Sequence, residues 1–481
     1  MIDIFLKEEF YAYDSFHITK AFFPDEEIKQ HIVPDQEELL TVEKEQEVIF
    51  KMDDVVLSGL EDKKEKKSFV NKKIYKELST YSGKELAWGI LTGVRPTKLA
   101  MKKVEEGCTD EEIVAWFREN YMVTEKKAKL GVEIAKREKA LLERLDYQNG
   151  YSLYVGIPFC PSICSYCSFS SYPLQEWQEK VDGYLDALCK ELAFVGEASR
   201  EKKLNTVYIG GGTPTTLSAE QMDRLLTHME KAFSYEHLIE FTVEAGRPDS
   251  ITKEKLEVLR NHNISRISVN PQTMQQKTLD VIERKHTVQD VVDIFRMARE
   301  LGFDNINMDL IAGLTGEHLS DMEDTLKQIE TLKPDSLTVH SLAIKRAARL
   351  GKTEGYKDSL SPAEELEQMI ERAAEYAEKM ELVPYYLYRQ KNIAGNFENV
   401  GYAKVDKAGI YNILIMEEKQ SIVAAGAGAS TKIVLPKGKE IPDKKTGDLK
   451  NIVRVENVKD VKEYISRIDE MIERKGEWLW R

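Results

Sequence analysis

The sequence lacks long apolar runs and is poor in cysteine. No stretch of about 18 or more uncharged apolar residues occurs in the chain, so we expect no membrane span. The N-terminus, MIDIFLKEEFYAYD, has neither a basic start nor a long apolar segment, and it therefore does not predict a secretory signal. Five cysteines without such a signal do not form a disulfide framework in a chain of 481 residues. We therefore expect a cytoplasmic protein, in which clustered cysteines more often bind metal or take part in chemistry.

Basic residues are also fewer than acidic residues. The chain has 83 acidic residues against 69 Lys and Arg, which gives a formal net charge of −14. This charge repels a polyphosphate unless a local basic patch overrides it, and acidic residues surround the lysine-rich stretch at 63–73. The composition therefore disfavours nucleic acid as a substrate.

The patterns that are present divide the chain into three parts. Residues 1–150 mix strand-like pieces with helical runs, and we interpret them as an N-terminal α+β region. Residues 151–382 alternate short β-branched or aromatic runs with amphipathic helices. Residues 383–481 are rich in aromatic, Asn and Gly residues at their start, and we expect an accessory region packed over one end of the central part. The expected strands of the central part are 152–157, 205–210, 239–244, 265–270, 305–311 and 335–342.

Six strand–helix units in a row predict a parallel sheet with right-handed crossovers. We therefore expect an α/β fold, either an incomplete (β/α) barrel or an open doubly wound sheet.

Three cysteines follow the first of these strands at a C-x3-C-x2-C spacing. On one tight loop, Cys160, Cys164 and Cys167 can direct three thiolates at one metal centre. A structural zinc site needs a fourth ligand, and no cysteine or histidine occurs from residue 168 to 188. A four-iron cluster held by three thiolates leaves one iron open instead, and S-adenosylmethionine can chelate that iron through its amino and carboxylate groups.

Such a site is a radical generator. The reduced cluster gives one electron to the sulfonium, which yields methionine and a 5′-deoxyadenosyl radical. Zinc, another type of cluster, and three incidental cysteines remain the alternatives at this point.

The cysteine loop, preceded by Tyr154 and the segment I-P-F, resembles the radical S-adenosylmethionine superfamily. More narrowly, it is similar to the oxygen-independent coproporphyrinogen III oxidase (coproporphyrinogen dehydrogenase) family and its heme-chaperone relatives. The segments WGILTGVRPTK and PYYLYRQKNIAGNFENVGYA resemble the longer variant with an N-terminal extension. The resemblance implies a partial (β/α)6 radical SAM barrel with an N-terminal α+β region and a C-terminal accessory region. It also implies a 4Fe–4S cluster and S-adenosylmethionine as cofactors.

In this family the cofactor site gathers at the carboxyl ends of successive strands. The turn G-G-G-T-P after the second strand is expected to lie against the methionyl amino group, because glycine permits a close approach of the backbone. The resemblance assigns the cluster to Cys160, Cys164 and Cys167. It assigns contacts to S-adenosylmethionine to Tyr154, Tyr166, Gly212, Thr213, Glu244, Gln272, Arg284, Asp309 and Ala343.

The family converts two propionates of coproporphyrinogen III to vinyl groups by oxidative decarboxylation, which gives protoporphyrinogen IX for heme biosynthesis. A substrate with four carboxylates needs cationic donors. The candidates at the mouth of the barrel are Arg346, Arg349, Arg389 and Lys391. A reductant protein such as flavodoxin or ferredoxin is the implied partner.

One position departs from the authentic oxidases. They have a further cysteine two residues after the third ligand, whereas Phe169 stands at that position here. The heme-chaperone branch has a similar non-cysteine residue there. We therefore keep three hypotheses: a coproporphyrinogen III decarboxylase, a heme-binding chaperone, and a radical enzyme that acts on another substrate.

Overall fold

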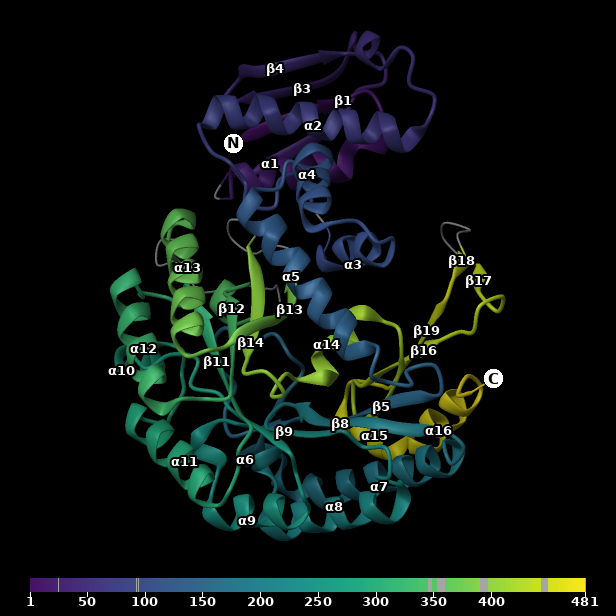
Figure 1. Cartoon of the computed structure of the whole chain (residues 1–481), viewed down its shortest axis with the longest axis vertical. Helices are drawn as coiled ribbons and strands as arrows, with labels where there is room; N and C mark the ends of the chain where they lie inside the picture. Colours follow the sequence, from purple (N-terminus) through teal and green to yellow (C-terminus); the bar gives the residue numbers. More distant parts are fainter. Residues whose placement is uncertain are drawn as a thin grey trace.

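Six parallel strands form the centre of the computed structural model (Figure 1). They follow one another across the sheet in chain order, as the alternating sequence pattern predicts. They are β5 (Gly150–Ile157), β8 (Lys203–Gly211), β9 (Glu240–Gly246), β10 (Arg266–Val269), β11 (Ile306–Ala312) and β12 (Ser336–Ser341). The structure describes residues 1–24, 26–91, 93, 95–344, 348–352, 360–389, 397–442 and 449–480.

Helices connect these strands and form an arc around the outside of the sheet (Figure 1). Each has an apolar face that it buries, and several begin at a capping box; in α8, for example, Ser218 and Gln221 cap the first turn reciprocally. The helices are α7 (Val181–Ala198), α8 (Ala219–Ala232), α9 (Lys253–Asn261), α10 (Gln276–Val281), α11 (Val288–Glu300), α12 (Leu319–Leu332) and α13 (Ala363–Lys379). The α/β class and the incomplete barrel are therefore confirmed.

The C-terminal region adds strands to both edges of the same sheet. Its elements are β13 (Val383–Arg389), β14 (Glu398–Ala403), α14 (Ile410–Glu417), β15 (Ser421–Ala425), β16 (Ser430–Val434), β17 (Ile441–Pro442), β18 (Leu449–Lys450), β19 (Ile452–Glu456), α15 (Val461–Ser466) and α16 (Ile468–Gly476). The strand order is β13-β14-β12-β11-β10-β9-β8-β5-β15-β16-β19. β14 pairs antiparallel with β12, whereas β15 pairs parallel with β5. The sequence patterns do not indicate these two long-range pairings.

The N-terminal part begins with a smaller sheet of order β2-β1-β3-β4 and its own apolar core. Its elements are β1 (Ile2–Leu6), α1 (Ala12–Phe22), β2 (Ile28–Ile32), β3 (Glu38–Lys44), β4 (Glu47–Asp53) and α2 (Lys63–Ser82). Three further helices, α3 (Thr97–Glu105), α4 (Asp110–Tyr121) and α5 (Glu125–Leu142), share the apolar core of the large sheet instead. We keep the division of the chain near residues 150 and 382 as a proposal.

A buried carboxylate connects this N-terminal part to the large sheet. Glu398 of β14 is 1% exposed and accepts a hydrogen bond from the Trp88 indole at 2.7 Å. The ammonium group of Lys127, in α5, forms an ion pair with the same carboxylate. Because a buried charge is costly unless it is paired, these two contacts hold α5 and the segment before it against β14.

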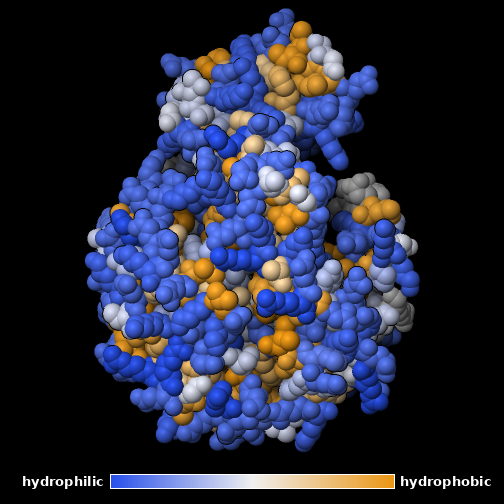
Figure 2. All heavy atoms as spheres, in the orientation of Figure 1, coloured by the Kyte–Doolittle hydropathy of each residue, from blue (hydrophilic) through white to orange (hydrophobic). Residues whose placement is uncertain are grey.

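Hydrophilic residues cover most of the face seen in Figure 2, and apolar residues lie there in separate patches. Among the described residues, no helix has the length and apolar character that crossing a membrane requires.

Candidate active site

A cavity of about 490 Å³ opens where the carboxyl ends of the parallel strands meet. Every residue that the resemblance assigns to the two cofactors lines this cavity: Tyr154, Cys160, Cys164, Tyr166, Cys167, Gly212, Thr213, Glu244, Gln272, Arg284, Asp309 and Ala343. The structure thus brings these residues together, while the role of each stays a prediction.

The cysteine loop connects β5 to the first helices of the barrel. It is held at its ends by pairing of β6 (Phe159–Cys160) with β7 (Tyr172–Pro173) and internally by a hydrogen bond from Cys167 N to Cys164 O at 3.2 Å. Within the described ranges, no three Cys, His, Asp or Glu side chains converge closely enough to hold a single metal ion. A four-iron cluster is bound by thiolates at separate corners, so its ligands need not converge on one point.

Burial changes the acidity of these thiols. It raises the pKa of the Cys160 thiol and the pKa of the Cys167 thiol. Both therefore hold their protons at neutral pH in the chain alone, and binding of iron must release those protons.

The glycine turn packs directly under the cysteine loop. Gly212 N donates to Ile157 O and Thr213 N donates to Phe159 O, each at 2.7 Å. A Cβ atom at Gly212 would lie 2.5 Å from Phe159 O and 3.0 Å from Cys160 Sγ. Only glycine therefore fits at this position, and the turn leaves its backbone exposed toward the cavity.

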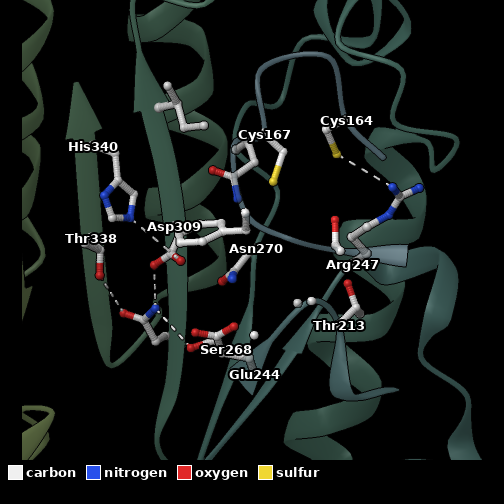
Figure 3. A pocket seen from close by; sticks show the side chains of 18 of the residues that line it. Cys164, Cys167, Thr213, Glu244, Arg247, Ser268, Asn270, Asp309, Thr338 and His340 are labelled. Atoms are coloured by element: carbon white, nitrogen blue, oxygen red, sulfur yellow. Dashed lines mark hydrogen bonds and ion pairs between the residues drawn. The ribbon is translucent and has the colours of Figure 1, made fainter. Parts of the chain in front are cut away.

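Two buried arginines support the same loop. Arg247, which directly follows β9, donates from Nη1 to Ser162 O at 2.8 Å and lies 3.7 Å from Cys164 Sγ (Figure 3). Arg284 donates to Asn270 O at 2.5 Å and interacts with Cys164 and Tyr166. Arg284 is predicted from the sequence, whereas Arg247 is not, although its position directly after a strand end was the available signal.

Two carboxylates at strand ends face the cavity from different environments. Burial raises the pKa of Glu244 to about 7, even though the Tyr208 hydroxyl donates a hydrogen bond to this carboxylate. Burial also acts to raise the pKa of Asp309, but the nearby His340 ring and the Asn307 amide outweigh it and hold that pKa below its ordinary value (Figure 3). Around neutral pH the site therefore contains one carboxylate that stays ionised and one that is partly protonated.

Two amide oxygens at the end of β10 have no hydrogen-bond partner among the described residues. Asn270 Oδ1 and Gln272 Oε1 are both buried, and both side chains line the cavity. Gln272 also has a positive φ of 68°, an uncommon conformation for a residue other than glycine. Because a buried acceptor without a donor is costly, these oxygens are suited to N–H or O–H groups of a bound ligand. Gln272 is predicted from the sequence, whereas Asn270 is not.

Aromatic rings form one wall of the cavity. Tyr208 of β8 stacks on Tyr411 of α14 with ring centroids 4.5 Å apart, and Tyr154 of β5 stacks near both. Tyr386 and Tyr388 of β13 also line the cavity. The C-terminal region therefore completes a pocket that the central strands begin.

The structure gives a different result for the Arg and Lys side chains that were expected to bind carboxylates of the substrate. Arg389 is 3% exposed and donates to Leu91 O at 2.7 Å, and it is not among the described residues that line the cavity. The expectation that it binds a substrate carboxylate is therefore wrong, because its guanidinium is used between β13 and the N-terminal part. Arg349 forms an ion pair with Glu283 at 2.5 Å and donates to Ile163 O in the cysteine loop. Arg346 and Lys391 lie outside the described residues.

Fold and site together define a radical SAM protein. The sequence matches the radical SAM superfamily over residues 154–329. Among solved structures, the chain is similar to coproporphyrinogen III oxidase (HemN) from Escherichia coli, with a TM-score of 0.53 and 21% identity over 69% of this chain and 73% of that one. At this level of identity, the structural likeness concerns the fold alone.

The sequence relatives are more specific. The chain is 42% identical over 406 residues to the oxygen-independent coproporphyrinogen-III oxidase-like protein HemZ from Bacillus subtilis, which covers 84% of this chain and 79% of HemZ. It is also 39% identical over 194 residues to heme chaperone HemW from Bacillus subtilis, which covers 40% of this chain and 50% of HemW. The chain belongs to the oxygen-independent coproporphyrinogen III oxidase-like family of radical SAM proteins. Its cofactors are accordingly a 4Fe–4S cluster and S-adenosylmethionine.

Proposed function

We propose that this protein catalyses the oxidative decarboxylation of coproporphyrinogen III propionates to vinyl groups. Each event removes one hydrogen atom from the β-carbon of a propionate, releases carbon dioxide and passes one electron to an acceptor. Two events give protoporphyrinogen IX. The observation that carries the proposal is the 42% identity to the oxidase-like protein HemZ across most of both chains, together with one cavity that contains every residue assigned to the cofactors.

The residues that line the cavity are suited to both cofactors. Cys160, Cys164 and Cys167 would hold the cluster, and the bare backbone at Gly212 leaves room beside it. When bound, the cluster and S-adenosylmethionine supply the one-electron chemistry that removes a hydrogen atom from the substrate. The chain itself contributes ligation, orientation and exclusion of water.

The polar groups of the strand ends would orient S-adenosylmethionine. The unpartnered oxygens of Asn270 and Gln272 can accept from its amino group or its ribose hydroxyls. The ionised Asp309 is suited to the same donors, whereas Glu244 can exchange a proton near neutral pH. We also propose that Gly212, Thr213, Arg284, Ala343, Tyr154 and Tyr166 complete this binding site.

The aromatic wall would contact the macrocycle. Tyr386, Tyr388 and Tyr411 line the cavity, and aromatic side chains suit contact with the pyrrole rings of a tetrapyrrole. A reducing protein such as flavodoxin or ferredoxin would supply electrons to the cluster.

The test is anaerobic turnover by the reconstituted protein. The chain, S-adenosylmethionine, a reductant, a one-electron acceptor and coproporphyrinogen III are incubated together, and 5′-deoxyadenosine, carbon dioxide and protoporphyrinogen are measured. We expect two molecules of 5′-deoxyadenosine and of carbon dioxide for each protoporphyrinogen. The Cys164→Ala variant should lose iron and turnover, whereas Cys189→Ala, in helix α7, should retain both. If the rate of S-adenosylmethionine cleavage does not depend on coproporphyrinogen III, the proposed substrate is wrong, whereas the radical chemistry is unaffected.

Delivery of heme is the second candidate. It is favoured by the relationship to HemW and by Phe169, which lines the cavity with 72% of its surface exposed at the position where authentic oxidases have a cysteine. Stoichiometric binding of heme without decarboxylation, and loss of heme affinity in Phe169→Ala, would support this candidate against the first.

A further inference from the structure

The strongest unassigned feature of the site is the buried guanidinium of Arg247. This side chain is 3% exposed. Its Nη1 atom lies 2.8 Å from Ser162 O, 2.9 Å from Ser162 Oγ and 3.7 Å from Cys164 Sγ. A positively charged group therefore lies beside one sulfur atom of the cysteine loop, that of Cys164 (Figure 3).

A carboxylate fixes the orientation of this guanidinium. Asp249 accepts from Arg247 Nε at 2.9 Å and from Arg247 Nη2 at 2.6 Å. This two-point contact leaves Nη1 as the atom directed at the cysteine loop. A planar guanidinium held in this way delivers its remaining donor in one direction, which the flexible ammonium group of a lysine does not do.

The donors at the cysteine sulfur atoms are not equivalent. The Thr213 hydroxyl, which is neutral, donates to Cys160 Sγ at 3.6 Å. Cys164 Sγ instead faces Arg247, and Arg284 interacts with it as well. Hydrogen bonds and positive charge at a ligand sulfur favour the reduced, more negative state of an iron–sulfur cluster and raise its reduction potential.

We propose that Arg247 is a positioning residue that orients Cys164 and raises the reduction potential of the bound cluster through a charge-assisted hydrogen bond to its sulfur. The inference rests on the proposed ligand role of Cys164, and it is independent of which substrate the enzyme takes. Cleavage of S-adenosylmethionine begins with a one-electron reduction of the cluster, so this residue controls how strong a reductant the protein requires.

The test is a redox titration of the reconstituted cluster without substrate, followed by electron paramagnetic resonance. At the solution potential where the wild-type cluster is half reduced, we expect the ratio of reduced to oxidised cluster in Arg247→Gln to fall about tenfold, which is about 1.4 kcal/mol, because the cluster loses a charge-assisted hydrogen bond. For one electron, this change corresponds to a shift of about 60 mV to more negative potential. Iron content per chain is measured on the same samples.

Two further variants separate charge from structure. Arg247→Lys keeps the positive charge and should recover part of the potential, whereas Asp249→Asn should give an intermediate shift because the guanidinium loses its fixed orientation. Arg389→Gln is the matched control, since it removes another buried guanidinium that donates to backbone carbonyls away from the cysteine loop. Its cluster should titrate like the wild type.

Three results would overturn the inference. The first is a wild-type potential in Arg247→Gln with full iron content. The second is equal loss of iron in the Gln and Lys variants, which would give Arg247 a purely structural role. The third is an equal shift in Arg389→Gln. Full iron content in Cys164→Ala would instead remove the premise that Cys164 is a ligand, and that outcome is separate from any failure of the coproporphyrinogen reaction.

Discussion

Glu244 makes the stability of the folded chain depend on pH in a direction opposite to that of ordinary ion-paired carboxylates. Its pKa rises from 4.5 to about 7 on folding, because the carboxyl group is taken out of water. The folded chain therefore holds a proton between these values that the unfolded chain releases. The stability from this group is fully present below about pH 4.5 and is lost as pH rises toward about 7.

The size of the effect follows from the shift. Each pKa unit corresponds to about 1.36 kcal/mol, so the full shift destabilises the folded chain by about 3 kcal/mol above pH 7 relative to acid conditions. In Glu244→Gln this contribution is absent. As pH rises from 5 to 8, we expect the free energy of unfolding of the variant to increase relative to that of the wild type, by most of these 3 kcal/mol.

Urea unfolding of the cluster-free protein at several pH values measures this difference. In the difference between variant and wild type, the contributions of other titrating groups cancel. One such group is His286, whose pKa is lowered by burial to about 4. Tyr208→Phe is the informative partner variant, because the Tyr208 hydroxyl lowers the pKa of Glu244 and its loss should extend the pH dependence to higher pH. A difference between Glu244→Gln and wild type that is the same at pH 5 and pH 8 would refute the reasoning.

Two further predictions concern a close contact at a glycine and a buried ion pair. In Gly212→Ala the new Cβ meets Phe159 O at 2.5 Å, and a strain of about 1–3 kcal/mol should weaken iron binding roughly ten- to hundredfold, as measured by iron per chain after reconstitution. Gly183→Ala has open space and should bind iron normally; equal iron in both variants would contradict the argument. Lys475→Met leaves the fully buried Glu191 without its cation and should cost about 3–5 kcal/mol in urea unfolding, and an unchanged midpoint would disprove it.

The parts of the site that could be predicted from sequence are those encoded locally. The spacing of Cys160, Cys164 and Cys167 places three thiols on one loop whatever surrounds it. The strand pattern then places Glu244 and Asp309 at one edge of a parallel sheet, because the carboxyl ends of parallel strands meet there. These signals need only the chain within one strand–helix unit.

The parts that could not be predicted depend on contacts between distant segments. β15 pairs with β5, and Tyr411 reaches the cavity, only because the C-terminal region returns to both edges of the sheet. Arg389 shows the converse error. An arginine near the expected mouth of the barrel suggests a donor to a substrate carboxylate, yet its guanidinium donates to the carbonyl group of Leu91, on a segment far away in sequence.

The contacts of Glu398 restrict how the chain can be shortened. A fragment that starts at residue 151 would contain the core strands and the cysteine loop, and it would look like a self-sufficient catalytic unit. It would also lose Trp88 and Lys127, the two side chains that compensate the Glu398 carboxylate. Expression of such a fragment would therefore require Glu398→Gln or an apolar residue at that position, and recombination with related proteins should transfer the segment from Trp88 to Lys127 together with β14.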